Sequence, residues 1–535
     1  MTRILIRCDA SSLMGSGHVI RCRTLARELQ RRGAEVLFLC RQQHGDLIGL
    51  LEQEFRVLAL PDQALASCED LEGRELYQAW LGCSQEQDAK QCLAALTSAG
   101  IHSADWLVVD HYGLDAVWQS QLIAGLEDKA TAKLLVIDDL ADRPHQPDLL
   151  LDQNFFGAAT EQRYQKLVPA DCRQLLGPHY ALLGPEYAQL HPLIPPRTEL
   201  RRVLVFFGGV DQDNLTGRAL EALMDPALAH LAVDVVVGRQ SPHRPFLAEL
   251  VMQRPHTTLH DPLPSLAGLI ARADLAIGAG GATTWERACL GLPSLVVAIA
   301  ANQLPFARAL DDAGHLLLLG GADMVSAEQI CSAVKSRLHE PMVGAGGSAL
   351  TDGWGASRLA TAMLGAEGSL RLKLATVSDE ALLLRWANDS KVRANSFKPD
   401  PIIADNHHHW FHQGLKNPSR LLFIAMAENG CPLGQIRFDK KVASDESECD
   451  EAKIDFSLDC CARGFGMAGE ILRQGLYAMV QHWNEPVVAM AEVFTDNITS
   501  NACFARAGFV LEFVESGESQ GRSFNRWCSS SAALS

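Results

Sequence analysis

Short apolar runs alternate with segments of helical period from the first residues of the chain. The apolar runs are nearly continuous in apolar character, and segments of helical period at about 18–32 and 114–126 lie between them. The four runs are Arg3–Cys8, Glu35–Cys40, Trp106–Asp110 and Lys133–Ile137. Strands buried on both faces read as continuous apolar runs, whereas half-exposed strands alternate. The pattern therefore predicts a parallel sheet covered by helices on both faces.

This pattern weakens at Leu193–Arg197, where two adjacent prolines predict a linker, and then starts again. New strands are predicted at Arg202–Phe207, Val233–Val237, Leu275–Ile277 and Ser294–Ile299. We therefore predict an α/β architecture of two doubly wound, Rossmann-like lobes, over residues 1–195 and 200–365, which bind ligand at the carboxyl edges of their strands.

Residues 370–535 follow a different pattern. A strand and an amphipathic helix at Asp379–Asn388 precede strands near Leu421–Met426 and Gly434–Phe438, without a second long series of strand-helix-strand units. This order predicts a separate α+β domain.

Composition narrows the classes of function. The 535 residues are 47% hydrophobic and 21% charged, and their formal net charge is −17. A strongly acidic chain is a poor match for nucleic acid or an anionic membrane surface, so neither is expected as a partner. The fifteen cysteines lack a paired CxxC framework, and neither a signal peptide nor a membrane-spanning run is evident. We therefore expect reduced thiols and a cytoplasmic location.

Polar residues gather where strands of the first lobe are predicted to end. These clusters are Asp9–Ser12, Asp110–Gly113, Asp138–Asp139 and Asp152–Asn154. Each alone is consistent with helix caps or turns, but together they predict the rim of an active site.

The segment Met14-Gly15-Ser16-Gly17-His18 lies between a predicted strand and helix. Glycine allows close approach of the backbone to a ligand, and a helix start offers free N–H groups. The positive end of the helix favours a neutral His18 that can accept a proton. A turn capped by a histidine is the alternative.

Two glycine-rich loops follow strands of the second lobe. Gly278-Ala-Gly280-Gly281-Ala-Thr-Thr-Trp-Glu286 opens a helix, and Gly208-Gly209 ends the first strand of this lobe. Such loops predict a diphosphate cradle, with Glu286 placed to bind ribose hydroxyls. The glycine spacing of a Rossmann dinucleotide site and the lysine of a P-loop are both missing, which disfavours nicotinamide and ATP.

With these motifs in order, residues 1 to about 365 resemble the UDP-sugar hydrolase family of pseudaminic acid biosynthesis, relatives of the two-lobed GT-B glycosyltransferases. The matching segments are Asp9–His18, Asp110–Asp115, Ile137–Ala141, Leu151–Asn154, Gly278–Glu286 and Ala301–Gln303. The resemblance implies hydrolysis of UDP-2,4-diacetamido-2,4,6-trideoxy-β-L-altrose to the free sugar and UDP.

The same resemblance implies roles for particular residues. His18 looks like the catalytic base, Tyr112 and Asn302 look like sugar-site residues, and the remaining residues look like the substrate and UDP site: Gly17, Gly208, Gly209, Gly280, Gly281 and Glu286. Three alternatives stay open, namely a glycosyltransferase, a hydrolysing UDP-sugar 2-epimerase, and a non-catalytic UDP-sugar-binding scaffold joined to an active acetyltransferase.

In the last domain, Arg463-Gly464-Phe-Gly466-Met-Ala468 follows a predicted strand at Ile454–Leu458 and opens a helix. Downstream, Glu492–Phe509 includes Asn497 and ends in Gly-Phe. These motifs resemble the GNAT acetyltransferases, which implies acetyl-CoA bound by Arg463, Gly464, Gly466, Ala468 and Asn497. In the pseudaminic acid pathway such an enzyme acetylates the amino sugar just before the hydrolase acts.

Many GNAT relatives have a tyrosine at the position of Phe504, whose ring cannot protonate a leaving thiolate. No general acid is therefore assigned, and Glu492 and Asp455 are candidates for the base, or else surface or packing residues.

The run His407-His408-His409 suggests a metal cluster. Consecutive residues of a helix point about 100° apart, so the three rings cannot all face one ion. The segment Asp405–Leu415 is instead predicted to be an amphipathic helix, and no metal is expected.

Overall fold

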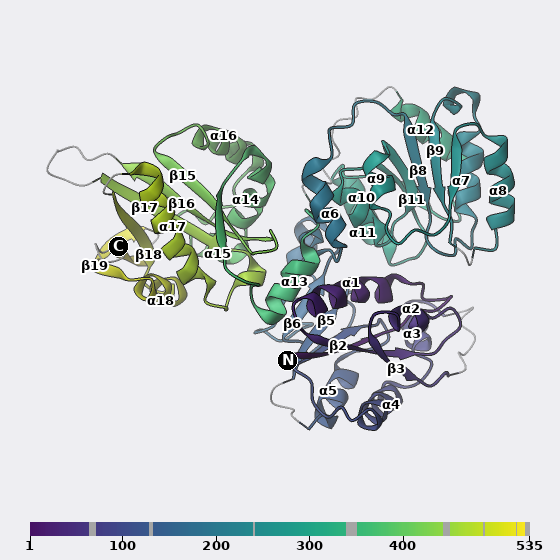
Figure 1. Ribbon diagram of the computed structural model, residues 1–535, viewed down its shortest axis with the longest axis horizontal. Coiled ribbons are helices and arrows are strands. Elements are labelled where there is room, and N and C mark those ends of the chain that lie inside the picture. Colours follow the sequence, from purple (N-terminus) through teal and green to yellow (C-terminus); the bar gives the residue numbers. More distant parts are fainter. Residues whose placement is uncertain are drawn as a thin grey trace. The chain divides into compact units, whose positions relative to one another are not determined.

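The computed structural model describes residues 1–63, 71–127, 132–238, 241–338, 350–441, 450–484, 487–519 and 522–529. It divides into two compact units, Met1–Ser357 and Arg358–Ser535. The first unit contains two parallel sheets and the second a largely antiparallel one, so the predicted fold class is confirmed (Figure 1).

The first sheet has the strand order β3-β2-β1-β4-β5-β6-β7, and its ladders are parallel. Its strands are β1 (Arg3–Cys8), β2 (Glu35–Arg41), β3 (Arg56–Leu60), β4 (Trp106–Asp110), β5 (Lys133–Ile137), β6 (Leu149–Asp152) and β7 (Arg173–Leu176). The helices of this lobe are α1 (Gly17–Arg31), α2 (Ile48–Leu51), α3 (Gly73–Trp80), α4 (Gln85–Ser98) and α5 (Ala116–Gly125). Helices α4 and α5 pack on one face of the sheet, around the fully buried Trp118.

The second sheet repeats the plan with the order β10-β9-β8-β11-β12-β13. Its strands are β8 (Arg202–Phe206), β9 (Ala232–Val236), β10 (Thr257–His260), β11 (Leu275–Ala279), β12 (Ser294–Ala298) and β13 (Leu317–Gly321). Its helices are α6 (Pro185–Leu190), α7 (Leu215–Leu223), α8 (Arg244–Gln253), α9 (Ala267–Arg272), α10 (Thr283–Cys289), α11 (Gln303–Asp312) and α12 (Ala327–Arg337). Figure 1 shows α7 and α8 on one side of β8 and β11, and α9 and α10 on the other.

In both parallel sheets the strand order reverses beside the first strand. In the first sheet this point lies between β1 and β4, and in the second it lies between β8 and β11. Loops leave the two strands in opposite directions there, which opens the carboxyl edge of an α/β sheet to a ligand.

The second unit contains a sheet with the order β14-β15-β16-β17-β18-β20-β19. Its strands are β14 (Arg371–Leu374), β15 (Arg420–Met426), β16 (Pro432–Lys441), β17 (Asp450–Leu458), β18 (Val487–Phe494), β19 (Phe509–Ser519) and β20 (Arg522–Ser529). Its helices are α14 (Glu380–Ala387), α15 (Ser390–Ala394), α16 (Ala404–Gly414), α17 (Met467–Trp483) and α18 (Ile498–Arg506), and α13 (Gly355–Leu364) contains the boundary between the units.

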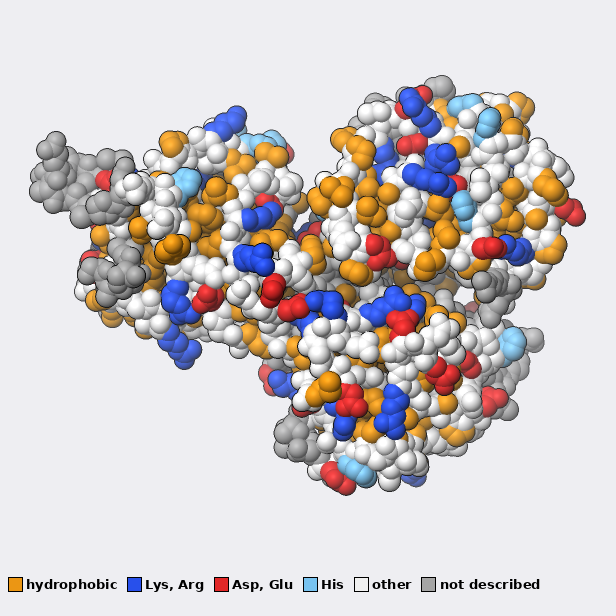
Figure 2. All heavy atoms as spheres, viewed as in Figure 1, with side chains coloured by type: hydrophobic (Ala, Val, Ile, Leu, Met, Phe, Trp, Pro, Cys, Tyr) orange, Lys and Arg blue, Asp and Glu red, His pale blue; other side chains and the backbone are white. Residues whose placement is uncertain are grey.

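On the visible face, acidic and basic side chains are interspersed among apolar ones (Figure 2). The thirteen cysteines in the described part of the chain are all free thiols. Within the same residues, no helix combines the length and the apolar character needed to cross a membrane.

A buried ionic network joins α4 to the first sheet. The Asp88 carboxylate accepts hydrogen bonds from Arg7 (Nε–Oδ1, 3.1 Å) and from the indole of Trp118 (2.9 Å), and it also pairs with Arg41. Burial alone would raise the pKa of Asp88, but the two guanidinium groups hold it well below its ordinary value. The network thus keeps two buried cations neutralised beneath the strands.

Replacing Asp88 with Asn should lower the free energy of unfolding by about 3–5 kcal/mol, because two buried guanidinium groups lose their shared counter-ion. Urea denaturation of the full chain, followed by circular dichroism, measures this loss. Glu199→Gln is the control, since Glu199 forms an exposed pair with Arg201 and its removal should not shift the curve. A midpoint for Asp88→Asn equal to that of the control would contradict the assigned role.

Candidate functional site

The first-turn histidine of α1 lies against the end of a neighbouring strand. His18 Nδ1 is 2.6 Å from Asp110 Oδ1, and Asp110 is the last residue of β4. Cys8, at the end of β1, is in register with Asp110, so α1 starts directly beyond the point where the strand order reverses. When Nδ1 donates its proton to Asp110, Nε2 becomes the proton-accepting nitrogen of the ring.

Asp110 is fully buried and carries the charge that orients His18. Arg21 donates to both of its oxygens, with Nε–Oδ2 and Nη2–Oδ1 distances of 2.6 Å each. Burial alone would raise the pKa of Asp110, but Arg21 and His18 hold it well below its ordinary value. The carboxylate therefore stays ionised and can accept a hydrogen bond from the imidazole N–H.

Asp110 belonged to a polar cluster in the sequence, but neither it nor Arg21 was singled out as a site residue. The available signal was the spacing of His18 and Arg21, which share one face of a helix. Arg21 also donates to Asp139 (Nη1–Oδ2, 3.1 Å), which lies two residues beyond the end of the adjacent β5. Two of the predicted polar clusters are thereby joined through one guanidinium group.

Tyr112 connects this group to the second lobe. Its ring is nearly buried and meets His18 edge-on, with ring centroids 4.5 Å apart. Its hydroxyl accepts a hydrogen bond from Asn302 Nδ2 at 3.2 Å, and Asn302 precedes α11. The structure thus brings together His18, for which the resemblance implies the role of base, and Tyr112 and Asn302, for which it implies a place in the sugar site.

Two further aromatic residues, which the sequence reasoning missed, lie beside Tyr112. Tyr77 and Trp80 of α3 have ring centroids 5.1 and 6.2 Å from that of Tyr112. Their three-residue spacing on a helix was the only signal available. With His18 they form an aromatic wall, a surface that suits the apolar face of a sugar ring.

The two glycine loops of the second lobe are neighbours. Phe206 of β8 is in register with Gly278 of β11, so Gly208–Gly209 and Gly280–Gly281 both leave the sheet at its point of reversal. Gly208 has a φ of 98°, a left-handed conformation that favours glycine. The Gly280 N–H already donates to the Val297 carbonyl at 3.1 Å, so an anion at these loops would be bound by other backbone N–H groups.

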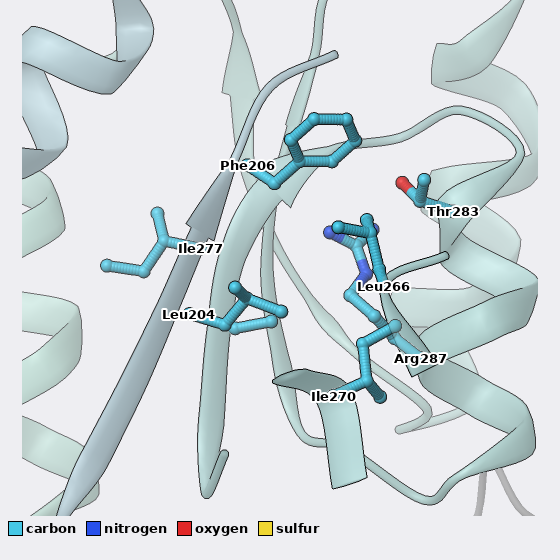
Figure 3. A pocket seen from close by; sticks show the side chains of 8 residues that line it. Leu204, Phe206, Leu266, Ile270, Ile277, Thr283 and Arg287 are labelled. Atoms are coloured by element: carbon cyan, nitrogen blue, oxygen red, sulfur yellow. The ribbon is translucent and has the colours of Figure 1, made fainter. Parts of the chain in front are cut away.

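A buried arginine supports the second loop from below. Arg287 Nη2 donates to the carbonyl of Ala279 at 2.8 Å, and a Cβ on Gly278 would lie 2.5 Å from Arg287 Nη1. Figure 3 shows the Arg287 side chain among Phe206, Leu266 and Thr283, with which it lines a small pocket. Glycine at 278 is thus required by this close packing, in addition to any ligand.

Glu286 lies in the first turn of α10. Its Oε2 is buried and, among the described residues, has no hydrogen-bond partner. Burial raises the pKa of Glu286 to about 7, while Tyr187 and Arg287 oppose the rise. A carboxyl group with an uncommitted oxygen one turn beyond a glycine loop is suited to accept hydrogen bonds from ribose hydroxyls.

In the second unit, two parallel strands separate along their length. The ladder between β17 and β18 runs from Asp450↔Val487 to Lys453↔Met490 and then stops. Beyond this point β18 stays paired on its other edge with β20, from Met490 to Phe494, while β17 continues to Leu458 beside β16. Among the described residues, no ladder joins β17 to β18 past Lys453 and Met490, and a ligand in extended conformation suits such a separation.

The turn after β17 has the form expected of a pyrophosphate loop. Gly464 and Gly466 have φ values of 89° and 77°, and α17 begins directly after Gly466, with Ala468 in its first turn. The guanidinium of Arg463 instead contacts the Leu458 carbonyl and pairs with Asp389. Arg463 thus holds the loop in place, and the groups that the start of α17 offers to an anion are backbone amides.

The other predicted residues of this domain have partners within the fold. Asn497 caps α18, with its side-chain oxygen accepting from Ser500 N at 3.2 Å. Phe504 is buried against Phe456, Phe509 and Trp527. Of the two candidates for a base, Glu492 pairs with Lys453, and Asp455 accepts a hydrogen bond from Gln435.

A comparison with protein families supports the assignment of the second unit. The family model described as an acetyltransferase (GNAT) domain matches residues 369–510. The second unit therefore contains a GNAT acetyltransferase domain.

Relatives match the first unit or the whole chain. The chain is 25% identical over 367 residues to the spore coat polysaccharide biosynthesis protein SpsG of Bacillus subtilis, covering 67% of this chain and 96% of that protein. It is 27% identical over 214 residues to UDP-2,4-diacetamido-2,4,6-trideoxy-beta-L-altropyranose hydrolase of Campylobacter jejuni, covering 40% and 63%. An uncharacterized protein of Methanocaldococcus jannaschii is 20% identical over 524 residues, covering 95% and 96%. The arrangement of both units in one chain thus has a counterpart along nearly its full length.

The raised pKa of Glu286 should make stability depend on pH. Between its ordinary value of 4.5 and about 7, the folded chain holds a proton that the unfolded chain has lost. Stability attributable to this residue is therefore present below pH 4.5 and declines as pH rises through 7. Relative to Glu286→Gln, the wild type should lose thermal stability between about pH 5 and 8. Parallel melting-temperature curves for the two proteins would contradict this assignment.

Proposed function

We propose that the first unit hydrolyses UDP-2,4-diacetamido-2,4,6-trideoxy-β-L-altropyranose to the free sugar and UDP, and that the GNAT domain N-acetylates an amino sugar with acetyl-CoA. The observation that carries the first part is the contact of His18 Nδ1 with Asp110 Oδ1, beside the contact of Tyr112 with Asn302. It supports a base and a sugar site formed from both lobes. The similarity to the C. jejuni hydrolase supports the choice of substrate.

The proposed reaction needs one base and a stabilised leaving group. Water attacks the anomeric carbon while His18 Nε2 accepts its proton, and Asp110 stabilises the imidazolium that forms. The bond between the anomeric carbon and the diphosphate oxygen breaks, and its electron pair leaves with UDP. Backbone amides of the glycine loops bind the departing charge, and Glu286 binds the ribose.

We assign the aromatic wall the role of positioning the sugar ring. Tyr112 contacts His18, Tyr77 and Trp80 pack against Tyr112, and the Tyr112 hydroxyl accepts a hydrogen bond from Asn302. In the proposed complex these groups position the sugar ring so that its anomeric carbon faces His18 Nε2. Such positioning converts attack by water into a reaction between groups already in place.

A glycosyltransferase would differ from the proposed hydrolase only in the group that accepts the sugar. A hydroxyl of a second sugar would take the place of water at His18, and UDP release would then require that acceptor. This second candidate is kept because the B. subtilis relative is a spore coat polysaccharide biosynthesis protein.

The GNAT domain is proposed to supply the substrate of the first unit. An amine of a UDP-sugar attacks the thioester carbonyl of acetyl-CoA, the new amide bond forms, and CoA leaves as the thiol after taking up a proton. The open strands β17 and β18 and the glycine turn before α17 support the binding of acetyl-CoA here. Acetylation in the same chain would deliver the diacetamido sugar that the hydrolase consumes.

Full-length protein should release UDP from the diacetamido substrate in water without a sugar acceptor. His18→Ala should lower kcat by a factor of about 10²–10⁴, the usual contribution of a general base, while UDP binding persists. A coupled assay for UDP measures the rate, and NMR follows the sugar product. The control is His102→Ala, since His102 is half-exposed beside Glu127.

Two outcomes decide between the candidates. Equal rates for wild type and His18→Ala would remove His18 from the chemistry. UDP release only after addition of a sugar acceptor would favour the glycosyltransferase.

Gly466→Val should raise the KM for acetyl-CoA by about tenfold, because a β-branched residue at a φ of 77° costs on the order of 1–2 kcal/mol, which the turn relieves by moving its amides. Release of CoA with a 4-amino UDP-sugar as acceptor measures the effect. Gly469→Ala is the matched control, because a Cβ there would make only an ordinary contact 3.6 Å from Arg473. Acetylation of peptide N-termini but of no amino-sugar nucleotide would contradict the proposed acceptor.

A further inference from the structure

Two histidines of α16 and one glutamate of α14 lie together on the second unit. His408 Nδ1 is 2.9 Å from Glu380 Oε1, and His412 Nε2 is 3.1 Å from Glu380 Oε2. The two imidazole rings have centroids 4.2 Å apart. The potential ligand atoms of all three residues lie within 4.8 Å of one another.

The face of α16 explains why these residues meet. His407 and Phe411 point into the core, where their rings stack with centroids 5.7 Å apart. His409 contacts Gln413 instead. The three consecutive histidines thus diverge, as their helical spacing predicts, but His408 and His412 are one turn apart and share a face.

We propose that Glu380, His408 and His412 form a binding site for a divalent transition-metal ion, with Zn²⁺ as the best-matched ion. Two imidazoles and one carboxylate are ligands of the type that Zn²⁺ takes from proteins, and two histidines four residues apart on a helix can reach one ion. The fourth position is left for water.

The present distances fit this assignment with small adjustments. Tetrahedral ligands at about 2.0–2.1 Å from Zn²⁺ are about 3.3 Å from each other. The two nitrogen–oxygen distances, 2.9 and 3.1 Å, are close to that value, although they involve the two different oxygens of Glu380. Since the three ligand atoms lie within 4.8 Å of one another, side-chain rotations are sufficient to bring them to one ion. The site is also reachable, since the His408 side chain is 62% exposed, and Figure 2 shows histidine side chains at the surface over α16.

The charge of the glutamate favours a cation. The Glu380 side chain is partly exposed, and an ordinary glutamate has a pKa well below neutral. The carboxylate is therefore ionised at neutral pH and available as a ligand without loss of a proton.

An ion at this site would link the first residue of α14 to the middle of α16. The chain between these helices, which contains α15, would then be held at both ends by one metal centre. Metal binding to the folded state alone stabilises it in proportion to the logarithm of metal concentration over Kd. The site would thus act as a structural clamp in the GNAT domain.

Isothermal titration of metal-stripped, full-length protein with Zn²⁺ tests the proposal. Wild type should bind one more equivalent than the His408→Ala/His412→Ala double variant, and each single variant should weaken that binding by at least about tenfold. His409→Ala is the matched control on the same helix and should bind like wild type. Circular dichroism verifies that the variants remain folded.

Co²⁺ used as a second probe separates this site from the thiols of the chain. The wild type should show the visible absorption of a nitrogen- and oxygen-ligated ion without the intense near-ultraviolet bands of thiolate ligation, and the double variant should lose it. Equal Zn²⁺ stoichiometry and affinity in wild type and double variant, or no binding by wild type, would overturn the proposal.

Discussion

The arrangement of the first unit depends on a carboxylate that is buried and yet charged. Asp110 ends β4 at the point where the strand order reverses, and both of its oxygens accept hydrogen bonds from Arg21. An isolated carboxylate in such a place would take up a proton, because burial penalises the ionised form. Since it remains ionised, it holds His18 with Nδ1 inward and Nε2 available. Tyr112 then packs against the ring that Asp110 has oriented.

The two lobes present different groups at the same opening in a parallel sheet. In the first lobe the loops beyond the point of reversal carry ionisable side chains, which proton transfer requires. In the second lobe the equivalent loops are rich in glycine, so backbone amides can approach a diphosphate closely. A glycine-rich loop has few side chains to fix its conformation. The buried guanidinium of Arg287 supports it instead, by donating a hydrogen bond to the Ala279 carbonyl. The hydrogen bond from Asn302 to Tyr112 joins these two sets of loops.

In the second unit, the candidate site lies in a different kind of sheet, where two parallel strands separate. Parallel pairing of β17 with β18 ends at Lys453 and Met490, which leaves room for an extended ligand beside the start of α17. The neighbouring side chains make contacts within the fold. Arg463 holds the turn through the Leu458 carbonyl, and Phe504 packs in an aromatic core with Trp527. Recognition of acetyl-CoA by backbone groups is consistent with this use of side chains, and it explains why the motif contains glycine.

Hydrophobic periodicity was sufficient to predict the three sheets and most of their strands, because a buried strand must be apolar whatever its neighbours are. Strand β1 at Arg3–Cys8 and strand β4 at Trp106–Asp110 were located correctly from this pattern alone. The motifs also indicated His18, Tyr112 and Glu286 as candidate site residues. Strand order, however, depends on contacts between residues far apart in sequence, and periodicity contains no information about them. For this reason only the tertiary structure paired His18 with Asp110, 92 residues away, and brought Glu380 to His408 and His412. The sequence determined which side chains were available, and the packing of helices and strands decided which of them share a site.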